Sequence, residues 1–264
     1  MYKRLVLIKL GGSLITDKRR EDIARHDVIK LCANEVGDMY RSLNDTHYII
    51  GTGAGSFAHI RAHKYHLREG AKTATQLYGM SVTHNSVRRL NGMVTDQLTS
   101  VGVPAFAVSP ASFITLDNAQ PYSVYMDSIM QLLLSGCIPL LHGDTILDKT
   151  RGTTILSTEK VLQVCLENLR SLYEEIIVIY CMDTDGLLDS SGKTVTQLKP
   201  DDELFTHQSS HHDVTGSIVG KVKSARLAAN IADRVYLVSG KNEGAIMGAI
   251  EDRRVGTKIQ NVGD

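Results

Sequence analysis

The stretch LVLIKLGGSLITDK, residues 5–18, begins as a short aliphatic run and ends in two glycines and a polar loop. Apolar runs of this length are typical of strands buried on both faces, as in parallel sheets. Five similar runs follow, at 47–50, 105–109, 137–142, 175–181 and 234–239. Between them lie longer stretches with helical spacing, at 22–43, 78–101, 123–135, 158–173, 219–232 and 242–252. This alternation predicts an α/β fold in which a mainly parallel sheet carries helices on both faces.

Glycines and aspartates gather just after the ends of these strands. They lie at 11–13, 51–56, 143–144, 183–186 and 240. In open α/β sheets ligands bind outside the carboxyl ends of the strands, so we expect these loops to form one site. The segment 190–215 is expected to be a polar excursion and not a linker between domains.

Composition and charge restrict the function classes. The 264-residue chain is 42% hydrophobic and 22% charged, which excludes disordered, collagen-like and disulfide-scaffold proteins. Its 29 basic and 29 acidic residues balance, so no overall field draws it to nucleic acid or to anionic lipid. No segment approaches the roughly 20 unbroken apolar residues of a membrane span, and the first apolar run is too short for a signal peptide.

The four cysteines, Cys32, Cys137, Cys165 and Cys181, form no C-x-x-C pair. This spacing argues against a zinc ribbon or a redox pair. We therefore expect free thiols in a reducing cytoplasm, and the length favours one large domain.

Two loops could hold phosphate groups. In the first, Lys9 precedes Gly11, Gly12 and Ser13, and Lys18 follows; glycine amides approach phosphate oxygens closely and lysines add positive charge. A tight strand-to-helix turn is the alternative interpretation. The second loop, GTGAGSFAH at 51–59, is not the dinucleotide fingerprint, because Ser56 stands where the third glycine is needed. It can still bind an anion beside His59.

Later motifs are weaker. The run DVTGSIVGK at 213–221 lacks Walker A spacing, which leaves Thr215 and Gly216 before a helix that carries Lys221, or an ordinary helix start. The run Asp183-Thr184-Asp185-Gly186 could contact Mg²⁺ or a ribose, or form a solvated turn. The cluster His211-His212-Asp213 has no third histidine at ligand spacing, so we expect no zinc site, and no motif indicates a hydrolase triad.

The ordered motifs together resemble the amino acid kinase superfamily, and within it isopentenyl phosphate kinases. They are KLGGSLITDK (9–18), GAGSFAH (53–59), VRRLN (87–91), GVPAFAVSPASF (102–113), HGD (142–144), MDTDG (182–186) and DVTGSIVGK (213–221). The resemblance implies an open αβα sandwich formed by a single domain over 1–264. Its acceptor-binding half would span about 1–165 and its ATP-binding half about 166–264. It also implies ATP and Mg²⁺ as cofactors, no resident metal site and a homodimer.

Site residues follow from the resemblance, position by position. The lysines Lys9 and Lys221 would flank the transferred phosphoryl group, and the nucleotide phosphates would contact Gly11, Gly12, Ser13, Lys18 and Gly216. His59 would hold the acceptor's own phosphate, together with Gly53, Ala54, Gly55, Ser56 and Thr215. The rest of the nucleotide would lie near Asp183, Asp185, Gly186, Gly240 and Lys241.

The chain departs from the family pattern on the acceptor side. Alanines occupy positions 54 and 58, where glycines are usual, and Ser157-Thr158-Glu159-Lys160 replaces a serine followed by Gly-Asp-Asp. Glu159 would then orient the lysines, and Ser157, Thr158 and Lys160 would approach the acceptor. Lys160 is similar to the basic residue of fosfomycin kinases. The helix face expected beside the acceptor's tail, Met80, Thr83, His84, Val87 and Asn91, is less apolar than a prenyl chain favours; it could instead simply pack on the sheet.

These features predict a kinase that transfers the γ-phosphoryl group of ATP to a small phosphate or phosphonate acceptor. Because such an acceptor is already anionic, no strong general base is needed, and His59 is expected to position it. The first candidate is isopentenyl phosphate. Fosfomycin is the second, and a nucleotide-binding sensor without catalysis is the alternative from another class.

Overall fold

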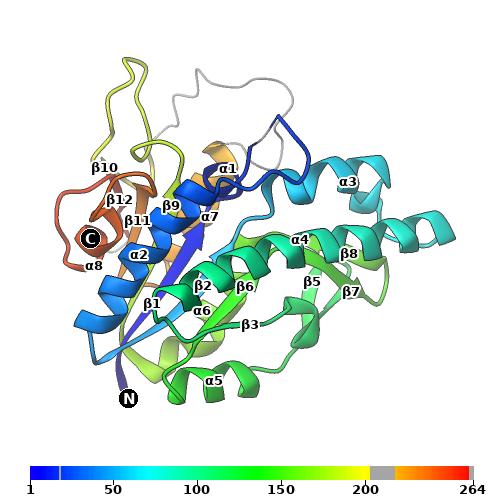
Figure 1. Ribbon diagram of the computed structural model, residues 1–264, viewed down its shortest axis with the longest axis horizontal. Coiled ribbons are helices and arrows are strands. Elements are labelled where there is room, and N and C mark those ends of the chain that lie inside the picture. Colours follow the sequence, from blue (N-terminus) through cyan, green and yellow to red (C-terminus); the bar gives the residue numbers. More distant parts are fainter. Residues whose placement is uncertain (18, 203–217, 262–264) are drawn as a thin grey trace.

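The structure, a computed structural model, describes residues 1–17, 19–202 and 218–261. Its main sheet has eight strands in the order β10-β12-β11-β9-β1-β2-β6-β3 (Figure 1). Their bounds are β1 (Tyr2–Leu10), β2 (Thr46–Thr52), β3 (Ala105–Ala107), β6 (Ile138–His142), β9 (Tyr173–Met182), β10 (Gln197–Leu198), β11 (Arg234–Ser239) and β12 (Thr257–Ile259). The pairs are parallel except β11 with β12. The α/β prediction is therefore confirmed, and all six predicted strands belong to this sheet.

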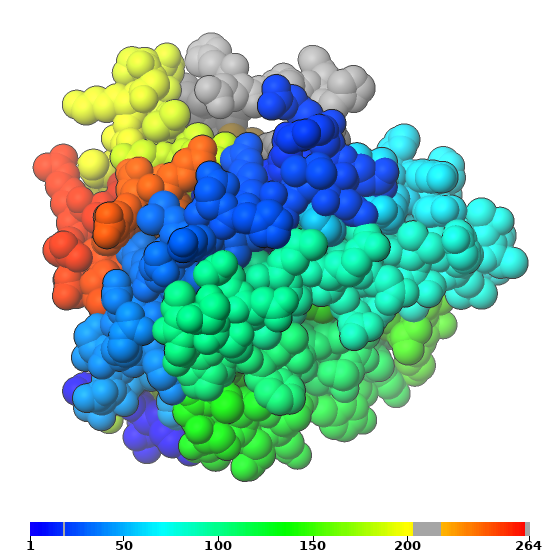
Figure 2. All heavy atoms as spheres, in the orientation of Figure 1, coloured from blue at the N-terminus to red at the C-terminus, as the bar shows by residue number. Residues whose placement is uncertain are grey.

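Helices cover both faces of the sheet, as Figure 1 shows. One face packs against α2 (His26–Ser42), α4 (Ala74–Ser100) and α8 (Ala245–Ile250), and the other against α5 (Asp127–Leu134), α6 (Thr158–Leu169) and α7 (Ile218–Ala229). Residues Val6 and Ile8 of β1 join the first of these two cores, and Leu5 and Leu7 join the second. Side chains alternate across a strand, so a run that is apolar at every position requires two covered faces. In space-filling view α2 and α4 hide most of the near face (Figure 2).

Short elements lie at the ends of these strands and helices. They are α1 (Gly12–Ile15), α3 (His59–Lys64), η1 (Gly55–Phe57), η2 (Leu67–Glu69), η3 (Pro110–Ser112) and η4 (Arg170–Leu172). The first three follow β1 and β2 directly, so they occupy the carboxyl edge of the sheet. Among the described residues no helix combines the length and the apolar character that crossing a membrane requires.

A second sheet was not predicted from the sequence. It contains β5 (Gln120–Val124), β4 (Ile114–Asp117), β7 (Asp144–Asp148) and β8 (Gly152–Leu156), in that order. The short strands β10 and β12 were also missed. These strands have two to five residues each and mix polar with apolar positions, so their strand pattern is weak, and pairing to a neighbour defines them instead.

Candidate functional site

The two glycine loops touch at the carboxyl edge of the sheet. The neighbouring strands β1 and β2 pair in parallel up to Leu10 and Thr52, so the loops that follow them start side by side. A Cβ added to Gly12 would lie 2.7 Å from the Cα of Gly55, and one added to Gly53 would lie 3.0 Å from the Cα of Gly12. Backbone atoms cannot yield at such distances, so this contact requires glycine at both positions.

A threonine hydroxyl locks the two loops together. Thr16 Oγ1 donates to the carbonyl of Gly12 at 2.7 Å and accepts from the amide of Ser56 at 3.1 Å. Gly55 has φ +50°, and a side chain there would collide with Thr16. The hydroxyl of Ser56 is buried and has no hydrogen-bond partner among the described residues. Buried polar groups normally have one, so this hydroxyl suits a ligand oxygen at the loop.

Near its carboxyl end, the buried strand β1 carries a lysine that pairs with a carboxylate on α6. Lys9 is only 6% exposed, and its ammonium donates to the carboxylate of Glu159 in the first turn of α6. Burial acts to raise the pKa of Glu159, but the Lys9 charge and hydrogen bond outweigh it, so the net shift is downward. The structure therefore places a fixed ammonium, with its counter-ion, beside the glycine loops.

The start of α6 is packed tightly against the same edge. Thr158 Oγ1 donates to the carbonyl of Thr52 at 2.8 Å, and a Cβ on Gly143 would lie 2.9 Å from the amide of Thr158. Ser157 is the N-cap and accepts from the amide of Lys160 at 3.4 Å. Of the four residues 157–160, Ser157 and Lys160 are exposed at this turn, whereas Thr158 is buried and positions the helix.

The residues expected near the nucleotide form a second group at this edge. Lys241 Nζ lies 2.6 Å from Asp183 Oδ1, and Arg25 Nη1 donates to the same oxygen at 2.9 Å. Burial acts to raise the pKa of Asp183, and these two cations lower it on balance. Asn242 donates to Asp185 at 3.2 Å. The loops after β9 and β11 are thus joined by ion pairs and amide contacts.

Glycines allow the chain segments of this second group to pack closely together. The amide of Gly11 donates to the carbonyl of Cys181 at 2.9 Å, and that of Gly240 donates to Met182 at 2.9 Å. Gly186 has φ +81°, and a Cβ there would lie 2.9 Å from the amide nitrogen of Thr257. At Gly11 and Gly186 a Cβ would meet backbone atoms, and at Gly240 it would meet the side chain of Leu14.

The helix that begins at His59 is anchored by residues that the sequence analysis did not single out. Arg61 Nη1 and Nη2 each donate to a carboxylate oxygen of Asp22 at 2.8 Å, and Arg61 also contacts Ser86 on α4 at 3.1 Å. Burial acts to raise the pKa of Asp22, and the Arg61 and Ser86 contacts lower it on balance. This network joins the loop after α1 to α3 and α4. The positive φ of 56° at Asp22 is a tertiary feature that no sequence pattern indicates.

A histidine and aspartate cluster lies beside the second loop. The sequence analysis placed His84 on the helix face expected beside the acceptor's tail, but it did not predict the pairing of His84 with Asp144. His84 Nδ1 lies 2.7 Å from Asp144 Oδ2, Ser109 Oγ donates to the same oxygen at 3.3 Å, and His142 Nδ1 lies 3.7 Å from it. The HGD run at 142–144 was the available signal. Thr83, Val87 and Asn91 are buried with Met80 and His84 partly so, so the helix face identified from the sequence packs toward the sheet.

Some of the expected positions are not brought into this geometry. Lys18, Thr215, Gly216 and the cluster 211–213 lie outside the described residues, and their roles stay predictions. Lys221 lies on α7, which packs against α6. Within the described part of the chain, no three His, Cys, Asp or Glu side chains gather as a metal site.

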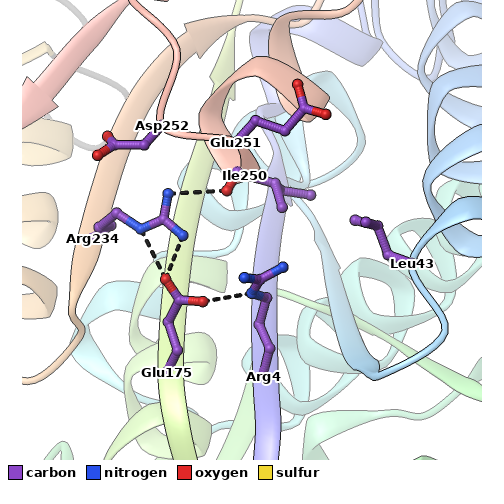
Figure 3. A pocket seen from close by; sticks show the side chains of 7 residues that line it. All are labelled: Arg4, Leu43, Glu175, Arg234, Ile250, Glu251 and Asp252. Carbon is purple, nitrogen blue, oxygen red and sulfur yellow. Dashed lines mark hydrogen bonds and ion pairs between the residues drawn. The ribbon is translucent and has the colours of Figure 1, made fainter.

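A hollow of about 530 Å³ lies at the other end of the sheet (Figure 3). Figure 3 shows Glu175 between Arg4, to which it is joined by a hydrogen bond of 2.6 Å, and Arg234, with Asp252 and Glu251 nearby. Two arginines face three carboxylates there, so the hollow has no excess positive charge for a phosphate. The glycine loops at the carboxyl edge remain the candidate site.

Comparisons with known proteins identify the family and the fold. The family model described as "Amino acid kinase family" matches residues 4–239. The isopentenyl phosphate kinase of Methanothermobacter thermautotrophicus is 28% identical over 270 residues, covering 97% of each chain. That of Methanocaldococcus jannaschii is 25% identical, covering 97% of this chain and 98% of the relative. A crystal structure of an isopentenyl phosphate kinase superposes with a TM-score of 0.77 at 25% identity, covering 97% of this chain and all of that one.

Proposed function

The chain belongs to the amino acid kinase family, and we propose that it is an ATP-dependent kinase whose first acceptor is isopentenyl phosphate. It would transfer the γ-phosphoryl group to the phosphate of that acceptor. Support comes from the isopentenyl phosphate kinases that match almost the whole chain, and from the site at the carboxyl edge.

One observation carries this proposal: the buried Lys9 ammonium held by Glu159 beside two interlocked glycine loops. Phosphoryl transfer requires alignment of the reactants and stabilisation of charge on the moving group. A lysine held in place at a strand end gives that charge without reorganisation during the reaction. The acceptor phosphate is itself the nucleophile, so no side chain needs to remove a proton.

The glycine loops and the group of contacts around Asp183 would bind different substrates. The acceptor would occupy the side of Gly53, Ala54, Gly55 and Ser56, with His59 as a positioning donor and Ser157, Thr158, Lys160 and Thr215 nearby. The nucleotide would occupy the side of Asp183, Asp185, Gly186, Gly240 and Lys241, with its phosphates toward Gly11, Gly12, Ser13, Lys18 and Gly216. Lys221 would complement Lys9 from α7. In this arrangement the acceptor half is about 1–165 and the ATP half about 166–264 of one domain.

The fit of the phosphates rests on features of the loops. Glycines at positions 12 and 55 keep side chains away from the point where the loops meet, and the buried Ser56 hydroxyl lacks a partner among the described residues. Mg²⁺ would neutralise charge on the nucleotide phosphates. It is commonly held by phosphates with one or two carboxylates, and Asp183 and Asp185 are the carboxylates on that side of the site.

We further propose a reducing cytoplasm and a homodimer as the setting. Burial raises the pKa of the Cys32 and Cys165 thiols to about 12, so both are protonated and unreactive as buried free thiols. The strand β3 ends the sheet order and exposes 55% of Phe106; an unprotected sheet edge of this kind suits a second copy. Sedimentation of the purified chain tests the dimer.

The function is tested by incubating the protein with ATP, Mg²⁺ and one acceptor at a time and following ADP release. We expect turnover with isopentenyl phosphate. Fosfomycin is the second acceptor to assay, because Lys160 is exposed directly beside Glu159. Turnover of the phosphonate alone would replace the first acceptor by the second. Binding of ATP with no transfer to either would instead favour the sensor.

A further inference from the structure

His84 is held by a buried carboxylate. The side chain of Asp144 has no exposed surface, and that of His84 is 28% exposed. The Nδ1 to Oδ2 distance is 2.7 Å, and the other carboxylate oxygen accepts from the amide of Thr145 at 2.7 Å. Among the described residues, no group forms a hydrogen bond with His84 Nε2. One ring nitrogen is therefore committed to the protein, and the other is left for a ligand.

This pair lies on the acceptor side of the candidate site. His142 pairs in register with Thr52, which directly precedes Gly53, and Asp144 is two residues further along the chain. On α4, Ser86 contacts Arg61 at 3.1 Å, so the turn that carries His84 adjoins the helix that begins at His59. The pair is thus linked to both parts of the expected acceptor loop, Gly53–Ser56 and His59.

The bonding pattern determines what Nε2 can recognise. With Nδ1 committed to Asp144, Nε2 accepts a hydrogen bond when the ring is neutral and donates one when the ring is protonated. A hydroxyl group can pair with either form. Burial lowers the pKa of His142, and the nearby charge of Asp144 offsets this lowering only in part. His142 is therefore neutral and does not compete with His84 as a charged partner of Asp144. A purely hydrocarbon tail beside Nε2 would exclude water and leave this nitrogen unpaired, so it binds less favourably than a tail that carries a hydroxyl.

We infer that His84 is a specificity residue whose Nε2 forms a hydrogen bond with a hydroxyl group on the acceptor's carbon chain. Among short-chain phosphate monoesters of the size of isopentenyl phosphate, the preferred acceptor is then one that also carries a hydroxyl, and isopentenyl phosphate is the weaker substrate. Asp144 is a positioning residue, which holds the tautomer and the ring. This inference rests on the proposed function, since it identifies the acceptor of the same kinase site.

Three esters with the same branched five-carbon skeleton test the inference. They are 3-hydroxy-3-methylbutyl phosphate, its saturated counterpart 3-methylbutyl phosphate, and isopentenyl phosphate. With the intact chain, ATP and Mg²⁺, we expect kcat/KM for the hydroxylated ester to exceed that for the saturated ester by about 10-fold, the value of one good hydrogen bond.

The variant His84→Asn tests the ligand contact of Nε2 while it keeps the hydrogen bond to Asp144. Its side-chain amide can still donate to Asp144, but it does not reach the position of Nε2. We expect it to reduce the 10-fold preference to about 1, mainly through KM for the hydroxylated ester, while KM for ATP is unchanged. Asp144→Asn should weaken the same preference, and His63→Asn, at an exposed position on α3, should leave it intact.

The outcomes separate the two proposals. If the intact chain phosphorylates isopentenyl phosphate but shows no preference for the hydroxylated ester, and His84→Asn leaves the ratio unchanged, the inference is overturned and the kinase proposal stands. If none of the three esters is phosphorylated although ATP binds, the proposed function is overturned, and the inference with it.

Discussion

At the scale of single residues, Lys9 is the most informative position. It is a charged residue inside the apolar run 5–10 and is almost fully buried, with Glu159 as its partner. Removing two charges from water is costly, so a buried ion pair is weak evidence for stability as such. A functional role for the ammonium explains why the strand carries it.

Glu159→Gln tests this role. Because the ammonium then lacks a counter-ion, we expect the free energy of unfolding to fall by about 1–3 kcal/mol and kcat to fall by at least about 10-fold as the lysine is no longer oriented. Urea unfolding and steady-state kinetics measure the two effects. Glu167→Gln, on the exposed side of the same helix, is the control. Unchanged kcat in Glu159→Gln would contradict the assigned role.

The scale of elements shows how the loops are kept in contact. The glycines after β1 and β2 meet where no side chain fits, whereas Gly92 on α4 has no atom within 4 Å of an added Cβ. At Gly12 and Gly53 the requirement for glycine is therefore set by the neighbouring loop, whereas at Gly55 the positive φ adds a local requirement.

Gly12→Ala should accordingly destabilise the fold by about 2 kcal/mol or more, since the added methyl meets rigid backbone, and should lower kcat/KM by at least about 100-fold. Gly92→Ala should have the opposite sign, stabilising by about 0.5–1 kcal/mol because alanine favours a helix. Thermal unfolding and ADP-release assays distinguish the two. Equal stability of both variants would show that the loops separate readily.

In the second sheet, Asp148 connects the turns. It accepts from the amides of Asn118, Ala119, Thr150 and Arg151 at 2.7–3.1 Å and from the Thr154 hydroxyl at 2.7 Å. Burial acts to raise its pKa, but these donors hold the pKa well below its usual value. A lowered carboxyl pKa stabilises the folded state above about pH 4, and that contribution is lost as the pH falls further.

Asp148→Asn should therefore lower the free energy of unfolding at pH 7 by about 1–3 kcal/mol. The difference from the unmodified chain should shrink as the pH falls below about 4, because protonation then removes the same charge. Urea titrations between pH 7 and pH 2 measure it, with Asp96→Asn, an exposed position on α4, as the control. A difference that stayed constant with pH would show that the charge of the Asp148 carboxylate does not contribute to stability.

At the scale of the whole molecule, the two proposed halves share one sheet and both cores. Strand β1 pairs with β9 from Tyr2–Tyr173 to Leu10–Cys181. Each hydrophobic core contains residues from before and after residue 165. The ion pair of Arg25 with Asp183 joins the halves again at the site.

We expect the chain to unfold in one cooperative transition, because neither half buries its strands alone. The chain has no Trp and ten Tyr, so tyrosine fluorescence and far-UV circular dichroism should give the same urea midpoint. A fragment of residues 1–165 should lack a cooperative transition. Two separate midpoints in the full chain would show instead that the halves are independent units.

Much of the fold and part of the site were determined by the sequence alone. Runs of apolar residues predict the central strands, since period and burial are local properties. The glycine loops and Lys9 are recognisable because phosphate chemistry requires particular residue types next to a strand end. The second sheet, the Asp22 anchor and the Asp144–His84 pair were decided only by the tertiary structure. The second sheet forms when β4 pairs with β7 and so joins two local hairpins. The Asp22 anchor and the Asp144–His84 pair likewise depend on contacts between residues distant in the chain, and such contacts leave no period or spacing in the sequence.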